Sequence, residues 1–381
     1  MLRWPWREGW RWPRARCPTG RCSWSCRWWS LWRSPPLCRC SASRACGRWR
    51  CSRPARSSPR RHWRRPEVLT CCRDRPAYRD AVGPETGDDA VRATARRLLP
   101  DTAASHVSAA EVVRGEFHDV VLLPGRAVVK VARGLAAQHL ERRAALLDAL
   151  ADAGLPLAVP RPLSEVVRTG EASAAVALSW VPGEPAPVGA GGEQRVEQLQ
   201  QLLTAMAAVD VSAGTPVGRC LDVPHAYAGR GRWAELMARV VAMLPDDVRD
   251  DAAACLRAAV DLPPVPPRLV HGDLAGHNLR WHADGTLAGV IDWDLASAWD
   301  PAVDLGCLVW FGWDAVDAAC AGLGGGWPTA AERARVWFAT FPLEGPAALL
   351  DDGAPAALVA ERLERVATAL RRERDAAGAR R

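Results

Sequence analysis

Three polar residues near position 280 have the types and the spacing needed to handle a phosphate group. Asp273 and Asn278 are five residues apart, and an apolar, strand-like run leads to Asp292. One carboxylate can orient a hydroxyl group, while a second carboxylate and an amide oxygen can hold Mg²⁺. Phosphoryl transfer depends on positioning and charge neutralisation more than on covalent chemistry. These residues are therefore suited to placing a phosphoryl group on a hydroxyl.

The composition singles out one of these positions and adds two others. The chain has one lysine (Lys130), one asparagine (Asn278) and one isoleucine (Ile291), although arginine, alanine, glycine and proline abound. A very GC-rich coding sequence explains this, because all three residues have A/T-rich codons. A residue type used once is then expected where its chemistry has no substitute. The alternative for Lys130 is an ordinary solvated position on a strand.

A β-hairpin and a third strand are expected to carry Lys130. Strands are predicted on either side of a turn at 115–118, where Gly115 would lie in a loop over phosphates. The third strand spans 127–132 after a Pro124-Gly125 turn. A P-loop is excluded, because it requires Gly-Lys-Ser/Thr and Lys130 is followed by Val131.

Hydrophobic periodicity predicts the remaining elements. Helices are expected at 89–100, 138–153, 192–209, 232–245, 247–260, 302–313, 329–341 and 354–376. Strands are expected at 163–167, 174–181, 279–282 and 287–292. The strand that ends at Ser179, Trp180 and Val181 precedes Pro182-Gly183. Its backbone is either a hinge that bonds an adenine edge or an ordinary strand end.

The motifs resemble those of the aminoglycoside phosphotransferase family. The resemblance rests on His271-Gly-Asp-x-x-x-x-Asn278, on Ile291-Asp-Trp-Asp294 and on Asp300-Pro-Ala-Val-Asp-Leu305. It covers roughly residues 105–345 and extends to choline and macrolide kinases. It implies an α+β, two-lobed protein-kinase-like fold. The N-lobe (81–182) would be an antiparallel sheet with a helix, and the C-lobe (183–376) would be mostly helical.

The resemblance also implies a role for each motif residue. Asp273 would be the catalytic carboxylate, and Asn278 and Asp292 would bind Mg²⁺. Lys130 would hold the α- and β-phosphates of the nucleotide, and residues 179–181 would meet its base. The donor would be ATP or GTP, and the acceptor would be a hydroxyl group of a small molecule.

Four further residues have expected supporting roles. His271 is expected to hold the loop rather than act as a base, and Asp304 to bond the loop backbone. Asp294 is either a second acidic neighbour of the metal or a loop brace. Arg143 is a departure, because the family commonly has glutamate there to pair with the lysine. We expect Arg143 to face the nucleotide and contact a phosphate or an acidic loop residue.

Candidates for the acceptor pocket follow the last motif. A cationic acceptor favours aromatic and acidic surroundings. The alternative is that the aromatic residues belong to the core. The candidates are Trp310, Phe311, Trp313, Asp314 and Asp317.

Residues 1–80 lie outside the resemblance and differ in composition from the rest. They contain 21 arginines and four acidic residues, a net charge of +17, whereas residues 81–381 carry −10. They also hold nine of 13 cysteines and ten of 19 tryptophans. Three alternatives remain for this segment: a nucleic-acid or membrane-surface arm, a zinc module, or sequence upstream of a later start. The last is favoured. Arginines interrupt any apolar run long enough for a membrane span.

The sequence therefore predicts a Mg²⁺-dependent phosphotransferase that moves the γ-phosphate of ATP or GTP to a small-molecule hydroxyl. No membrane partner is expected, and a nucleic-acid partner is disfavoured. Scattered cysteines among apolar neighbours favour a cytoplasmic location. The alternative function is a nucleotide-binding pseudokinase or regulatory module with weak or no catalysis.

Overall fold

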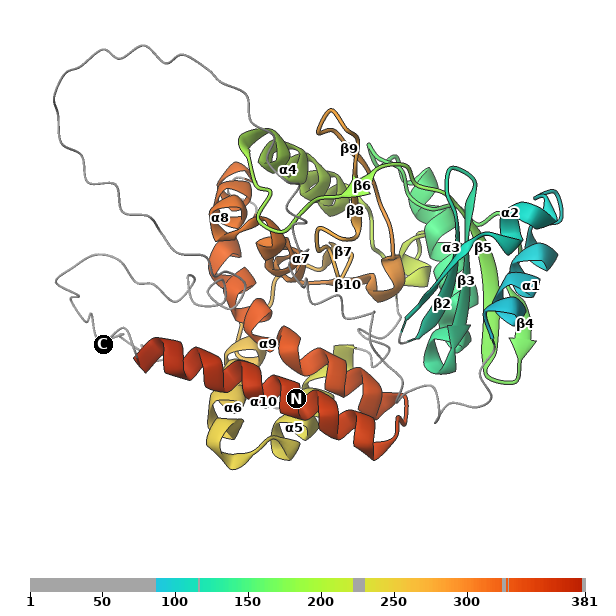
Figure 1. Ribbon diagram of the computed structural model, residues 1–381. Helices are drawn as coiled ribbons and strands as arrows, with labels where there is room; N and C mark the ends of the chain where they lie inside the picture. Colours follow the sequence, from blue (N-terminus) through green and yellow to red (C-terminus); the bar gives the residue numbers. More distant parts are fainter. Residues whose placement is uncertain (1–86, 116, 222–229, 324–326, 328, 379–381) are drawn as a thin grey trace, which may run out of the picture.

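The computed structural model describes residues 87–115, 117–221, 230–323, 327 and 329–378. Residues 1–80, and the predictions made for them, lie outside this part. Figure 1 shows a sheet flanked by helices beside a larger, mostly helical part. The predicted α+β, two-lobed architecture is confirmed. Among the described helices, none combines the length and the apolar character required to span a membrane.

Five antiparallel strands in the order β1-β2-β3-β5-β4 form the N-lobe sheet. They are β1 (Glu111–Arg114), β2 (His118–Leu123), β3 (Ala127–Arg133), β4 (Val167–Gly170) and β5 (Ser173–Ser179). Successive side chains of a strand point to opposite faces. Val129 and Val131 of β3 therefore pack in one cluster with Val91 and Ala95 of the first helix. Lys130, between them, points to the other face.

Helices cover both faces of this sheet. On one face lie α1 (Asp88–Leu98) and α2 (Ala104–Ser108), and on the other lies α3 (Gly134–Asp152). Leu140, Leu147 and Leu150 of α3 join Val176 and Leu178 of β5 in the main core. Lys130 and α3 are thus on the same side of the sheet.

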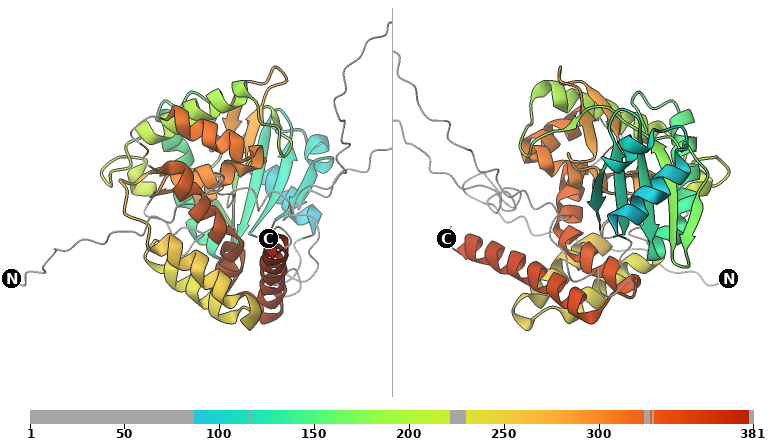
Figure 2. Two further views of the ribbon diagram at one scale, coloured as in Figure 1. Left: turned by 90° about the vertical axis from the view of Figure 1, so that its left-hand side faces the viewer. Right: turned by 45° about the vertical axis from the view of Figure 1, so that its right-hand side comes forward.

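The C-lobe contains the predicted motif strands and most of the helices (Figure 2). Its strands are β6 (Glu184–Pro185), β7 (Arg268–Val270), β8 (Leu279–Trp281), β9 (Leu287–Val290) and β10 (Ser297–Trp299). Its helices are α4 (Glu193–Ala208), α5 (Arg230–Met243), α6 (Asp246–Val260), α7 (Ala302–Cys307), α8 (Trp313–Gly322), α9 (Ala330–Asp351) and α10 (Ala356–Gly378). β7 pairs with β10, and β8 pairs with both β6 and β9.

Several predicted elements were wrong in their bounds, and three of these errors have a physical reason in the structure. The strand expected at 163–167 lies instead at 167–170, because Oγ of Ser164 accepts the N–H of Ala177 in place of a backbone carbonyl and interrupts the ladder. The helix expected at 302–313 divides at Gly312, whose φ of +104° is left-handed, and α8 begins after it.

The third error concerns a proline. The helix expected at 329–341 continues as α9 to Asp351, through Pro342 and Pro346. Proline removes one backbone hydrogen bond from a helix interior. Burial of Leu343, Ala347 and Leu349 offsets that loss, since tertiary packing supplies most of the stability of a helix in a protein.

Candidate active site

The backbone of the motif loop is held by a buried carboxylate. Asp304, in the first turn of α7, accepts hydrogen bonds from the backbone N–H groups of His271 (2.8 Å) and Gly272 (2.9 Å). Gly272 has a φ of +86°, and a Cβ there would lie 2.6 Å from the carbonyl oxygen of Leu295. The loop therefore requires glycine at this position, and Asp304 lies where the sequence places a structural aspartate.

The carboxylate of Asp273 is oriented by its neighbours in the loop. Asn278 donates through Nδ2 to the carbonyl oxygen of Asp273 (2.9 Å) and to its Oδ2 (3.0 Å). His277 places Nε2 3.4 Å from the same Oδ2. The side chain of Asp273 is 40% exposed, so that a substrate hydroxyl can reach it.

His271 lies beneath the loop rather than at its surface. Its side chain is fully buried, and burial lowers its pKa, which leaves a neutral ring. Nδ1 accepts from the backbone N–H of Asp273 at 3.2 Å, and Nε2 lies 3.0 Å from the carbonyl oxygen of Ile291. His271 therefore links the motif loop to the strand that leads to Asp292.

Asn278 and Asp292 are brought together by the hairpin of β8 and β9. The backbone N–H of Ile291 donates to the carbonyl oxygen of Asn278 at 3.0 Å. Asp292 follows with a φ of +65°, an uncommon conformation for a residue other than glycine. Because Nδ2 of Asn278 is bonded to Asp273, its Oδ1 remains the acceptor. A carboxylate and an amide oxygen fit Mg²⁺, which keeps its other positions for phosphate and water.

Lys130 reaches this part of the C-lobe from β3. Its Nζ lies 2.7 Å from Oδ1 of Asp292 and 2.5 Å from Oδ2 of Asp294. Burial lowers the pKa of Lys130, but the two carboxylates outweigh burial and raise it. Burial raises the pKa of Asp292, but the charge and the hydrogen bond of Lys130, with smaller contributions from neighbouring histidines, together outweigh burial and lower it. The structure thus brings together three residues that the sequence placed in one site.

A small cavity adjoins these ion pairs. Its polar lining is Lys130, Arg143, Asp292 and Asp294, and its other walls are mainly apolar. The rest of the lining comes from Leu140, Ala144, Leu147, Pro160, Val176, Leu178 and Trp293. A pocket with a mainly apolar wall and charged groups at one side suits a ligand with a flat base and phosphates.

The predicted loop around Gly115 is a tight turn. The backbone N–H of Gly115 donates to the carbonyl oxygen of His118 at 2.7 Å, and a Cβ at Gly115 would clash with that oxygen. Arg133 donates through Nη2 to the carbonyl oxygen of Gly115 at 2.9 Å. Only a residue without a side chain fits this approach.

The predicted hinge follows the cavity wall. Ser179 is bonded within the N-lobe, because its N–H donates to the carbonyl oxygen of Arg161 (2.7 Å) and its Oγ accepts from the N–H of Arg161 (2.8 Å). Trp180 is half-buried. Val181 is buried against Gly289 of β9. The segment therefore joins the two lobes at the edge of the cavity.

Arg143 faces the cavity and bonds the backbone of the C-lobe. Its side chain is 3% exposed, and Nη1 donates to the backbone carbonyl of Ala296 at 2.8 Å. This acceptor lies two residues after Asp294. A contact of Arg143 with a phosphate or an acidic side chain stays a prediction.

Most of the residues predicted to line the acceptor pocket do not lie beside the motif loop. Phe311 and Trp313 are buried in the main core, which confirms the alternative reading for them. Asp317 bonds Arg335 at 2.7 Å, and Asp314 is exposed on α8. Trp310 alone lies beside the motif loop, with its ring centroid 5.4 Å from that of His277 and its Nε1 bonded to Ala186.

His118 belongs to the site and was missed at the sequence level. Its Nε2 lies 3.2 Å from Oδ2 of Asp294, the atom that also accepts from Lys130. The signal was present in the hairpin. With a turn at Pro124-Gly125, β2 and β3 pair so that His118 lies opposite Ala132 and Val120 opposite Lys130. His118 and Lys130 therefore point to the same face.

Burial of His118 predicts a loss of stability in mild acid. Burial, followed by the charge of Lys130, lowers the pKa of His118 to about 4. Below pH 6.5, His118 is protonated in the unfolded chain but stays neutral in the folded chain. The free energy of unfolding should therefore fall by up to about 3 kcal/mol between pH 6.5 and 4. Chemical denaturation at several pH values measures this. His118→Gln should flatten the profile, and exposed His106→Gln should not; superimposable His118→Gln and wild-type profiles would contradict the prediction.

Comparison with known proteins identifies the fold and the family. Residues 110–337 match the phosphotransferase enzyme family. Viomycin phosphotransferase from Streptomyces vinaceus is 34% identical over 227 residues, 56% of this chain and 75% of that protein.

Two solved structures share the fold. The GDP complex of aminoglycoside 2'-phosphotransferase-IIIa has a TM-score of 0.60 at 16% identity, over 75% of this chain and 99% of that one. Macrolide 2'-phosphotransferase type I has a TM-score of 0.53 at 20% identity, over 74% and 98%.

The family match spans the motif loop, the lysine strand and the helices between them. It supports catalysis and gives no support to the pseudokinase alternative. The chain therefore belongs to the phosphotransferase enzyme family and is a kinase that acts on hydroxyl groups of small molecules.

Proposed function

We propose that this enzyme transfers the γ-phosphate of ATP or GTP to a hydroxyl group of viomycin or of a similar molecule, with Mg²⁺ bound. The observation that supports it most is the meeting of Lys130 with Asp292 at 2.7 Å, beside the oriented carboxylate of Asp273. The similarity to viomycin phosphotransferase supports the acceptor.

Asp273 would act on the acceptor. Its half-exposed carboxylate accepts the hydrogen bond of the hydroxyl, aims the oxygen at the phosphorus and takes the proton as the new P–O bond forms. The bond between the γ-phosphorus and the bridging oxygen breaks in the same step, and ADP or GDP leaves. Asn278 holds Oδ2 of Asp273, so that the carboxylate needs no reorganisation during the reaction.

Asp292 and Asn278 would hold Mg²⁺, which when bound neutralises charge on the phosphates. Lys130 would contact the α- and β-phosphates. The apolar cavity wall would take the base, and the backbone of Trp180 and Val181 would bond its edge. The turn at Gly115 would cover the phosphates.

Two coarser proposals accompany this one. The N-lobe is assigned to residues 81–182 and the C-lobe to residues 183–376, of which 81–86, 116, 222–229, 324–326 and 328 lie outside the described part. The location is cytoplasmic, which the buried thiol of Cys307 supports, because such thiols stay reduced there.

The test is a coupled assay of ADP or GDP release with candidate acceptors. Viomycin should give turnover above the rate without acceptor, and product mass should rise by one phosphate. Aminoglycosides, macrolides, choline, homoserine and sugars serve as comparison acceptors. Turnover with one of these and none with viomycin would reject the proposed acceptor while preserving the phosphotransferase.

A further inference from the structure

Three N-lobe side chains converge on one short segment of the C-lobe, residues 292–296. Lys130 of β3 bonds Asp292 and Asp294, and Nε2 of His118 of β2 lies 3.2 Å from Oδ2 of Asp294. Arg143 of α3 bonds the backbone carbonyl of Ala296. Three separate N-lobe elements therefore depend on the position of this segment.

We propose that Asp294 is the positioning residue for Lys130, and that Arg143 anchors α3 to the same segment. This inference rests on the proposed role of Lys130 in nucleotide binding. In protein kinases a glutamate of the corresponding helix pairs with the lysine. In this chain the carboxylate that pairs with Lys130 comes from Asp294 of the C-lobe. Helix α3 instead contributes Arg143, which donates to the backbone carbonyl of Ala296.

The two acids of the segment have different surroundings. The side chain of Asp292 is 49% exposed, whereas that of Asp294 is 15% exposed. Oδ2 of Asp294 accepts from Lys130 at 2.5 Å, and Nε2 of His118 lies 3.2 Å from the same oxygen. Burial lowers the pKa of His118, so that its ring occupies the space beside Asp294 without adding charge. Asp292 is therefore open to a metal, and Asp294 is committed to the lysine.

Charge balance explains why arginine is tolerated at position 143. Lys130 and Arg143 line one cavity, and two buried cations would repel each other in a low-dielectric site. Asp292 and Asp294 line the same cavity and offset both charges. When a metal engages Asp292, Asp294 remains as the carboxylate that holds Lys130.

Helix α3 is fixed at a second point as well. The backbone N–H of Leu135, in its first turn, donates to Oδ1 of Asp352 at 3.0 Å. Asp352 follows α9 directly, so the C-lobe caps the N-terminus of α3. With Arg143 bonded to Ala296 about two turns further on, α3 is held to the C-lobe without a lysine–glutamate pair.

The first experiment uses the fact that Lys130 is the one lysine of the sequence. Labelling with [ε-¹³C]lysine gives a single methylene signal in the full chain, without metal or acceptor. A pinned side chain shows two separate Hε shifts, and a mobile one averages them. Asp294→Asn should narrow the separation, and Asp148→Asn, on the exposed face of α3, should leave it unchanged. An unchanged separation in Asp294→Asn overturns the proposal.

The second experiment is a double-mutant cycle read as the Kd of Mg·ADP, or of Mg·GDP if wild type binds it more tightly. A hydrogen bond to a charged group is worth roughly 10- to 100-fold, so Asp294→Asn should weaken binding by about 10-fold. In a Lys130→Met background the same change should have no effect, because Asp294 acts through the lysine. The proposal is overturned if Asp294→Asn weakens nucleotide binding equally in the wild-type and Lys130→Met backgrounds. It is also overturned if Asp294→Asn raises the Mg²⁺ concentration needed for half-saturation in parallel with the Kd. Neither experiment needs an acceptor, so failure of viomycin as substrate is a separate result.

Discussion

Replacing Asp273 with asparagine is expected to lower kcat by about 1,000-fold, the middle of the range for positioned acid–base groups. The amide keeps the shape of the carboxylate and can still bond Asn278, but it cannot take the proton of the hydroxyl. Steady-state kinetics with a confirmed acceptor measure the change. The Kd of Mg·nucleotide should stay within about twofold of wild type, because binding and proton removal use different groups.

His277→Gln is the matched control for that loss. His277 lies 3.4 Å from Asp273 in the same loop, but its side chain is half exposed. In the described part of the chain, the loop backbone is held by Asp304 and His271 instead. Its replacement should lower kcat far less than Asp273→Asn does. If Asp273→Asn retained more than about a tenth of wild-type kcat, the assignment of the base would be contradicted.

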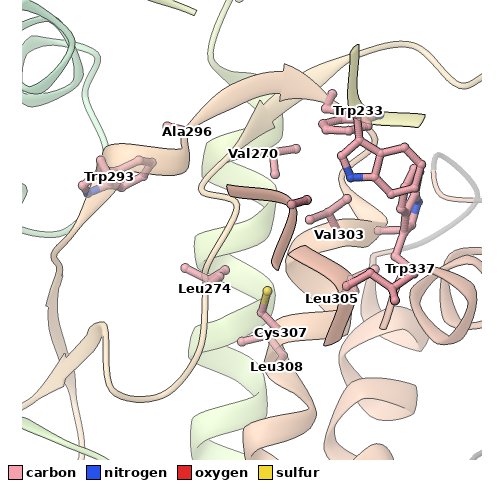
Figure 3. Close-up of a cluster of buried hydrophobic side chains, with 14 of the residues drawn as sticks. Trp233, Val270, Leu274, Trp293, Ala296, Val303, Leu305, Cys307, Leu308 and Trp337 are labelled. Carbon is pink, nitrogen blue, oxygen red and sulfur yellow. The ribbon is translucent and has the colours of Figure 1, made fainter. Parts of the chain in front are cut away.

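Replacing Arg333 with leucine is expected to lower the free energy of unfolding by about 3–5 kcal/mol, the usual effect of leaving a buried charge without its partner. Arg333 bonds Oδ2 of Asp300 through Nε (3.1 Å) and Nη2 (2.5 Å), and Trp337 donates to the same oxygen. Both charged side chains are less than a tenth exposed. Trp337 packs edge-on against Trp233 and Trp299, and Figure 3 shows Trp233 and Trp337 beside the core residues under the motif loop.

Arg335→Leu, two residues along the same helix, is the control for that prediction. Arg335 pairs with Asp317 at the surface and lies over the ring of Trp313. Exposed ion pairs contribute about 1 kcal/mol or less. Equilibrium denaturation of both variants gives the comparison. Equal losses for Arg333→Leu and Arg335→Leu would show that the Asp300 network is not a major source of stability.

The Asp300 network also supports the active site. Oδ1 of Asp300 accepts from the backbone N–H of Ala302 at 3.0 Å, at the start of α7. Asp304 of that helix then holds the backbone of His271 and Gly272. Activity should therefore fall along with stability when Arg333 is replaced.

Local spacing explains why much of the site could be predicted from the sequence. Asp273, Asn278 and Asp292 fall within 20 residues, and the β8–β9 hairpin between them is short enough to bring them together. Lys130 could be singled out because it has no second copy in the chain. The structure shows that it lies on the face of β3 that α3 covers, which strand alternation alone could not decide.

Contacts across long stretches of chain could not be predicted in the same way. The bond from Arg143 ends on a backbone carbonyl 153 residues away, and a backbone acceptor has no residue type to recognise. The contact between His118 and Asp294 depends on how the two lobes pack, which no local pattern encodes. The same limit applies to α9, whose continuation through Pro342 is decided by the helices around it.

Binding of Mn²⁺ in the presence of nucleotide, followed by the paramagnetic resonance of the free ion, tests the central claim most directly. The site described here requires Asp292 as a metal ligand and Asp294 as a support for Lys130. Asp292→Asn should weaken Mn²⁺ binding by more than about 10-fold. Loss of a residue that only orients a metal ligand already costs about 10-fold, and loss of the ligand itself should cost at least as much. Asp294→Asn should leave it within about twofold. Wild-type Mn²⁺ affinity in Asp292→Asn would contradict the proposed metal site and the mechanism built on it.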